Sequence, residues 1–340
     1  MQPFESGPGL RRDRHHPWLV RSVRVIAVVL VLGLLAAACG GDGTTPAALE
    51  SLPETTPTAP DGPASTPSAP VELPPDVSPA APIAAASELD LSVGSLPAEL
   101  APIAGVFSKH VSVWGVNIVA TSATKNAKIL HAANVTAQYL DNDADGVPDN
   151  QAVVDAMVAN GAMLLMAPTV NELENVPGAG DVFDFVGTGG QDLYGSETAP
   201  AGDFDAALEE IHHLILNTGW AWVFPDQLAQ AKGSAVAVAM DTARGGHFDT
   251  IPNPYPEGAW YTYDDETCDY RCMITEYTYW AHTSLLGAQQ DRRSDIAQEW
   301  RLETAAKIRS GDPAVVAILE DSALGLPTVL PDGNYQSVPR

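Results

Sequence analysis

The chain has 340 residues, 45% of them hydrophobic, and its 43 acidic and 17 basic residues give a formal net charge of −26. This excess of negative charge excludes partners that are themselves polyanions, so binding to nucleic acid or to an anionic membrane surface is not expected. The composition favours the binding of cations instead, and the length is enough for one large core or two lobes.

The first 38 residues have the pattern of an export signal. Five arginines precede an uncharged apolar run at 25–38, whose fourteen residues are fewer than the roughly 20 of a membrane-spanning helix. Small residues stand directly before Cys39, and this resembles the lipobox of bacterial lipoproteins. The resemblance implies cleavage before Cys39, lipidation of its thiol and a membrane anchor that places the protein on the extracytoplasmic face. Simple secretion is the alternative.

Residues 39–88 are rich in Pro, Thr and Ala and contain no aromatic residue. Such a segment cannot bury enough apolar surface to offset its ordering entropy, so we expect a disordered, extended linker. Residues 89–340 are predicted to form a single globular α+β domain, dominated by helices and with a small sheet.

Within that domain, the spacing of apolar residues predicts the elements in chain order. A strand is expected at 110–121 and another at 163–166, with short β-like runs in the glycine-rich stretch 181–194. Helices are expected at 126–140, 151–159, 203–217, 234–244, 273–287, 293–311 and 312–321. Cys268 and Cys272 lie close together, and in an exported protein such a pair indicates a disulfide, with a zinc dithiolate as the rival.

The loop after the first helix, DNDADGVPD at 141–149, has the spacing of a calcium-binding loop. Alternate aspartates around a tight glycine turn supply the hard oxygen ligands that Ca²⁺ prefers, and the loop resembles the DxDxDG part of EF-hands. Ala152 replaces the usual bidentate glutamate, so Asp155 is expected to curl back in its place. The predicted ligands of this structural calcium site, within 141–155, are Asp141, Asp143, Asp145, the carbonyl of Val147, Asp149 and Asp155. An acidic turn without an ion is the alternative.

A second candidate site is the sequence EEIHH within the predicted helix 203–217. Residues four apart share one helix face, so Glu209 and His213 are expected to lie close together, with Glu210 and His212 on either side. This pattern resembles the HExxH motif of zincin metallopeptidases, with Glu209 at the position of the first histidine. The alternative is a solvated charged face of an ordinary surface helix.

In the gluzincin group of these peptidases, a glutamate from a later helix completes the site, and Glu276 resembles that residue. A carboxylate inside an apolar aromatic helix is costly unless it is paired or binds a metal. The resemblance implies that Glu209, His213 and Glu276 hold Zn²⁺ and that Glu210 is the catalytic base, with His212 as a substitute ligand. His247 and His282 are separate metal candidates, for each of which an ordinary histidine is the alternative. The resemblance also implies that Tyr261, Tyr263 or Tyr277 stabilises the oxyanion.

Two functions are therefore expected. One is a zincin-like metallohydrolase at the membrane surface that acts on a protein or peptide substrate and carries structural calcium. The other is a calcium-stabilised surface lipoprotein that acts as a binding or adhesion module without catalysis. They are distinguished by whether Glu209, His213 and Glu276 converge in space.

Overall fold

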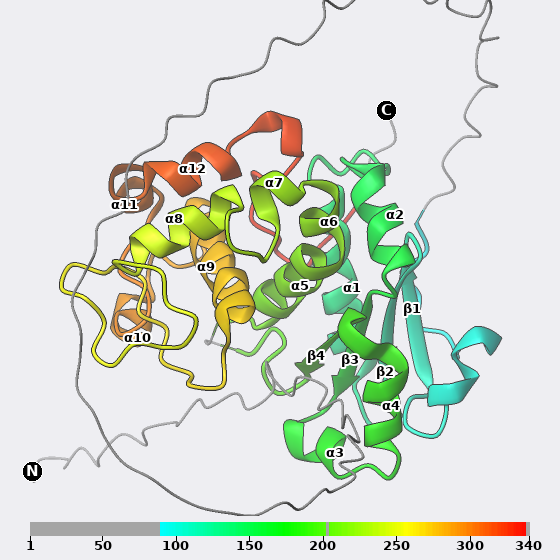
Figure 1. The fold of residues 1–340 in the computed structure, drawn as a ribbon. Coiled ribbons are helices and arrows are strands. Elements are labelled where there is room, and N and C mark those ends of the chain that lie inside the picture. The colour runs from blue at the N-terminus through cyan, green and yellow to red at the C-terminus, as the bar shows by residue number, and fades with distance from the viewer. Residues whose placement is uncertain (1–88, 202–203, 338–340) are drawn as a thin grey trace, which may run out of the picture. The chain divides into compact units, whose positions relative to one another are not determined.

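The computed structural model describes residues 89–201 and 204–337 (Figure 1). The predicted signal peptide, Cys39 and the linker at 39–88 lie outside the described residues. In the part that the structure describes, no helix combines the length and apolar character needed to cross a membrane. The described residues combine a four-stranded sheet with a larger number of helices, so the fold class is α+β.

The four strands form one sheet with the order β1-β2-β3-β4. They are β1 (Lys109–Val113), β2 (Val116–Ala120), β3 (Met163–Ala167) and β4 (Gly190–Tyr194). β1 and β2 are antiparallel, whereas β3 is parallel to both β2 and β4, which leaves β4 at an edge. The single strand predicted at 110–121 is wrong, because Trp114 and Gly115 have φ angles of 47° and 93° and turn the chain into a hairpin.

Both faces of the sheet are buried, and the strand residues alternate between two apolar clusters. On β3, Leu164 and Met166 belong to the main core, which also contains α1, α5, α8 and α9 residues. Met163, Leu165 and Ala167 face a smaller cluster that includes Leu100 and Leu173. Short helices pack on one face of the sheet through the smaller cluster. Most of the other helices pack on the opposite face through the main core.

Many more of the described residues lie in helices than in strands. Those around the sheet are η1 (Ala98–Ile103), α1 (Asn126–Leu140), α2 (Gln151–Ala159), α3 (Val170–Glu174), α4 (Ala179–Val186) and η2 (Gly187–Gly189). Those that follow are α5 (Ala207–Ile215), the π-helix η3 (Leu216–Trp220), α6 (Ala221–Val223), α7 (Pro225–Leu228), α8 (Ala235–Ala243), α9 (Tyr270–Leu285), α10 (Arg293–Ile296), α11 (Ala305–Gly311), α12 (Pro313–Leu319) and η4 (Ser322–Leu324). The helices predicted at 126–140 and 151–159 are confirmed.

Two further predicted elements differ from the structure. The stretch 181–194 begins inside α4 and becomes a strand only at β4. The helix predicted at 293–311 is interrupted, because residues 299–301 run extended beside 260–262. The N–H of Thr262 donates to the carbonyl of Glu299 at 2.7 Å, and Trp300 between them is fully buried. Burial of this indole and pairing of the backbone outweigh the local helical pattern.

The N-termini of the two helices that matter most for the candidate site, α5 and α9, are fastened by aspartates. Asp205 accepts a hydrogen bond from the N–H of Ala207 at 3.1 Å, and its other oxygen lies 2.5 Å from Nε2 of His131. Asp269 caps α9 by accepting from the N–H of Cys272 at 2.9 Å. A disulfide joins Cys272 to Cys268, so the loop before α9 is tied to its first turn.

Candidate metal centre

The helix α5 lies in the interior, between β4 and α1 on one side and α9 on the other (Figure 1). His212 and His213 are both fully buried, while Glu209 and Glu210 are partly exposed. The prediction that all four polar residues share one face therefore holds only for the glutamates and His213. A solvated surface face does not describe this helix, because both imidazoles are enclosed by protein.

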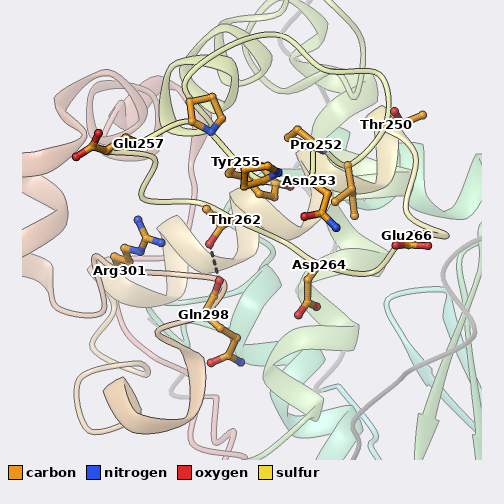
Figure 2. Close-up of a pocket in the computed structure, with 14 residues that line it drawn as sticks. Thr250, Pro252, Asn253, Tyr255, Glu257, Thr262, Asp264, Glu266, Gln298 and Arg301 are labelled. Carbon is orange, nitrogen blue, oxygen red and sulfur yellow. Dashed lines mark hydrogen bonds between the residues drawn. The ribbon is translucent and has the colours of Figure 1, made fainter.

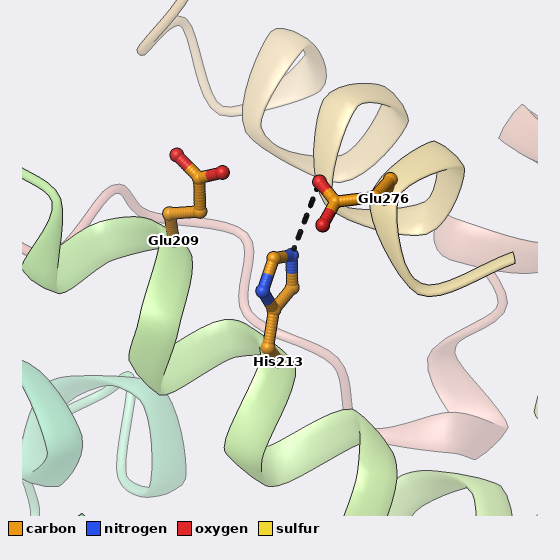
Figure 3. A group of neighbouring side chains, drawn as sticks. All are labelled: Glu209, His213 and Glu276. Carbon is orange, nitrogen blue, oxygen red and sulfur yellow. Dashed lines mark ion pairs between the residues drawn. The ribbon is translucent and has the colours of Figure 1, made fainter. Parts of the chain in front are cut away.

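Glu209, His213 and Glu276 converge from α5 and α9 (Figure 3). Each offers one ligand atom, and these atoms all lie within 4.8 Å of one another. The Nε2 atom of His213 is 3.6 Å from a carboxylate oxygen of Glu276. Atoms around one cation, each bonded at about 2 Å, are separated by at most about 4 Å, so small side-chain adjustments would close the group around an ion. The convergence that distinguishes the two expected functions is thus present.

Glu276 lies in an environment that a cation would suit. Its side chain is 1% exposed, and neither carboxylate oxygen accepts a hydrogen bond from any residue that the structure describes. Burial, followed by the negative charges of Glu209 and Glu210, raises the pKa of Glu276 well above its ordinary value. A buried carboxylate without a donor is costly unless it is protonated or bound to a cation, so the donor set fits a divalent metal.

Glu210 is positioned by the edge strand of the sheet. Gln191 on β4 donates a hydrogen bond from Nε2 to an oxygen of Glu210 at 2.6 Å. The same oxygen lies 3.7 Å from Nδ1 of His213, the ring nitrogen opposite the one that faces Glu276. Glu210 is therefore held beside the candidate centre and against the back of its imidazole. Gln191 was not predicted, because nothing in the residues around it indicates a contact with a helix that follows in the chain.

The other histidines lie outside the group. His212 faces His282, with 3.1 Å between Nε2 and Nδ1, and Nε2 of His282 is 2.9 Å from the carbonyl oxygen of Pro327. Burial lowers the pKa of both imidazoles. His247 lies between Asp241 and Asp249 at 3.0 and 3.2 Å. His212 does not belong to the converging group, and its Nε2 is directed at His282.

The three predicted tyrosines differ in what their hydroxyls contact. Tyr261 donates to the carbonyl of Met273 at 2.9 Å, and Tyr277 donates to Asp312 at 2.6 Å. The hydroxyl of Tyr263 makes no hydrogen bond with any described residue. Burial, together with the charges of Glu276 and Glu209, raises the pKa of Tyr263, so this phenol lies within the field of the centre. Tyr263 is the one of these three hydroxyls left available for a ligand.

The acidic loop 141–149 gathers a second group of carboxylates. Asp141, Asp143 and Asp149 each offer an oxygen, and the three oxygens lie within 4.8 Å of one another. Burial raises the pKa of Asp141 and of Asp149, and the neighbouring aspartates add to the shift at Asp149. Gly146 has a φ of 92° and donates its N–H to Asp141 at 2.8 Å, so the turn is built as the spacing predicts.

The remaining predicted calcium ligands do not converge with Asp141, Asp143 and Asp149. Asp145 accepts from the N–H of Val147 at 2.9 Å, and Val147 is exposed. Asp155 lies exposed on α2 and accepts from Gln151 at 2.9 Å. Neither Asp145 nor Asp155 belongs to the converging group, so the structure does not bring Asp155 back to the position that Ala152 leaves without a carboxylate.

A segment from late in the chain packs against this loop. Tyr335 donates its hydroxyl to Asp141 at 2.5 Å. Asn142 accepts from the N–H groups of Thr328 and Val329, both at 2.9 Å, and donates to the carbonyl of Val329 at 2.8 Å. These contacts join positions 186 to 194 residues apart, and local sequence patterns carry no signal for them.

In comparisons with known proteins, no protein-family model, no curated protein and no solved structure matches this chain.

Proposed function

We propose that this protein is a zincin-like metallohydrolase that cleaves peptide bonds and is tethered by a lipid on Cys39 to the extracytoplasmic face of a membrane. The observation that carries the proposal is the convergence of Glu209, His213 and Glu276 from two helices into a largely buried group. The binding-module alternative gives these three converging polar side chains, of which His213 and Glu276 are buried, no role.

The ligands would be one imidazole and two carboxylates, and Zn²⁺ binds both types at about 2.0–2.2 Å. Two carboxylates balance the charge of a divalent cation, which supports its binding in this buried place. A set with more oxygen than nitrogen is also suitable for Mn²⁺, so the metal content decides between the two. When bound, the ion would supply Lewis-acid polarisation and lower the pKa of a water molecule.

In this proposal Glu210 takes the proton of the attacking water on its carboxylate. The hydrogen bond from Gln191 fixes the orientation of that carboxylate at the edge of the sheet. Its 3.7 Å approach to Nδ1 of His213 also allows a second role, in which Glu210 holds the imidazole in the tautomer that leaves Nε2 free of a proton. Tyr263 would donate its phenolic proton as a hydrogen bond to the oxyanion of the tetrahedral intermediate.

We further propose that the loop 141–149 binds Ca²⁺ through Asp141, Asp143 and Asp149. The ion would relieve the repulsion between these carboxylates and fasten α1, α2 and the segment 328–335 to one another. Its role is structural, since the loop supplies oxygen ligands alone and no group of the proposed reaction lies among them.

The experiment that tests the proposal is metal analysis by inductively coupled plasma mass spectrometry, paired with a peptidase assay. Wild-type protein is compared with His213→Ala and Glu210→Gln. We expect about one equivalent of zinc or manganese in wild type and in Glu210→Gln, and its loss in His213→Ala. Turnover should vanish in both variants. A transition metal absent from wild type, or full turnover in Glu210→Gln, would refute the proposal.

A further inference from the structure

A cavity of about 780 Å³ lies between the loop 250–258, the segment 262–266 and residues 298–301 (Figure 2). The side chains that matter here are Tyr255, Glu257, Thr262, Asp264, Glu266 and Arg301. Cavities that hold small ligands or substrate side chains have volumes of roughly 300–1,000 Å³, so this one is large enough for a long side chain and part of a backbone.

One wall of the cavity is joined to the helix that carries Glu276. Thr262 and Asp264 line the cavity, and Tyr255, which also lines it, donates a hydrogen bond to the carbonyl of Tyr263 at 2.7 Å. Tyr261, in the same segment, donates to the carbonyl of Met273 on α9 at 2.9 Å. Met273 precedes Glu276 by about one helical turn, so the segment 261–264 connects the cavity to the helix of the candidate centre.

The charge of the lining is predominantly negative. Glu257, Asp264 and Glu266 contribute three carboxylates, and none of them forms an ion pair or a hydrogen bond with a described residue. The guanidinium of Arg301 donates to the carbonyl of Ala259. Figure 2 shows Asp264 and Glu266 across the cavity from Arg301. One end of the cavity therefore presents two carboxylates without a cationic partner.

We propose that this cavity is a substrate subsite that binds the cationic side chain of a lysine or arginine residue. The ammonium or guanidinium group would lie between Asp264 and Glu266, and its methylene stem would pack on the ring of Tyr255 and on Pro252. The inference rests on the proposed function, because it makes the cavity part of a peptide-binding cleft. The overall negative charge of the chain would steer such substrates towards it.

Binding is measured apart from catalysis. Full-length protein with the Glu210→Gln substitution is titrated into two fluorescein-labelled heptapeptides, followed by fluorescence polarisation at fixed ionic strength. Both are alanine peptides, one with a central lysine and the other with a central norleucine. Asp264 and Glu266 are exposed, so two ion pairs at the surface support a lysine preference of about five- to tenfold. Adding Asp264→Asn and Glu266→Gln should abolish that preference.

The matched control carries Asp226→Asn and Glu174→Gln, which remove the same charge from exposed positions on α7 and α3. The control should retain the lysine preference. Equal affinity for the two peptides, or a preference that survives in the cavity variant, would overturn the subsite. The failure of the proposed function looks different: the lysine peptide binds selectively to the cavity, yet wild-type protein hydrolyses neither peptide.

Discussion

His212 and His282 are joined through Nε2 and Nδ1 at 3.1 Å in the fully buried interior between α5 and α9. The carbonyl of Pro327 can only accept, so Nε2 of His282 carries the proton, and its Nδ1 must accept from Nε2–H of His212. Both imidazoles are therefore neutral, and each has one defined tautomer. The pair links the helix of Glu209 and His213 to the helix of Glu276.

The buried pair makes stability depend on pH. Burial lowers the pKa of His282 to about 4 from 6.5, so the unfolded chain binds a proton that the folded protein rejects. The stability is complete above pH 6.5 and is lost as the pH falls towards 4, by up to ~1.4 kcal/mol per pH unit. In His282→Gln, whose amide preserves both hydrogen bonds, the melting temperature should fall less steeply across this interval. His110→Gln on β1 is the control, and an equal slope in both variants would contradict the assignment.

The contribution of Glu276 to stability changes with pH in the opposite direction to that of His282. The raised pKa of Glu276 means that the folded, metal-free protein holds this proton more tightly than the unfolded chain, so stability declines as the pH rises above 4.5. We expect Glu276→Gln to raise the melting temperature of metal-free protein at pH 7 by about 2 °C or more, and to abolish the stabilisation by added zinc. Glu209→Gln, at a partly exposed position, should give no comparable gain. A lower melting temperature for metal-free Glu276→Gln would argue against a buried carboxylate that lacks a hydrogen-bond donor.

Tyr263 is the oxyanion donor that we propose among the three candidate tyrosines. Removing one such donor typically reduces kcat by 10²–10³, so Tyr263→Phe should show a loss of this order with little change in KM. Tyr261→Phe is the control, because that hydroxyl is already bound to the carbonyl of Met273. It should lose some stability and retain kcat. Steady-state kinetics on one peptide substrate separates the two, and equal kcat values in the variants would exclude the role of Tyr263.

Calcium should stabilise the loop 141–149. At a calcium concentration a hundred times the dissociation constant, binding stabilises the folded state by about 2.7 kcal/mol, and a chelator should lower the melting temperature accordingly. Asp143→Asn should abolish this response. Asp155→Asn makes the same change in charge outside the converging group and should leave the response intact. A melting temperature unaffected by chelator at millimolar calcium would exclude a structural ion.

Removal of the disulfide between Cys268 and Cys272 should lower stability without changing the metal content. Replacing both cysteines by serine opens a very short loop, and the cost should be about 2 kcal/mol, below the ~3 kcal/mol of a 15-residue loop. The transition-metal content should stay unchanged, because the ligands lie elsewhere. The metal content of the double variant is measured by inductively coupled plasma mass spectrometry. A loss of metal with the fold retained would support the alternative in which Cys268 and Cys272 bind zinc.

The sequence predicted those features that depend on neighbours along the chain. α1 and α2 follow from apolar spacing, and the pairing of Glu209 with His213 follows from one helical turn. Glu276 was identified from the resemblance to gluzincins, with the support that a carboxylate is unusual in an apolar helix. The hairpin of β1 and β2 and the extended pairing around Trp300 were missed, since both depend on tertiary contacts that outweigh local pattern.

The site was predictable to the same extent. Side chains on α5 were placed by periodicity alone, whereas the contact from Gln191 depends on where the edge strand lies. The partnership of His212 with His282 likewise requires knowing how α5 and α9 pack. Asp155 was assigned from the spacing of a known loop, but its helix carries it away from the other carboxylates.

The contacts of Asn142 with Thr328 and Val329, and of Asp141 with Tyr335, set an order of events during biosynthesis. A ribosome exposes the loop 141–149 long before it has made residues 328–335, so the nascent loop meets solvent and ions without its final covering. These contacts form only once translation has reached the last of these residues. A stalled or prematurely terminated chain would therefore leave Asp141 without the hydroxyl of Tyr335 and Asn142 without its partners at 328–329, whereas Asp143 and Asp149 are exposed to solvent in the finished protein as well.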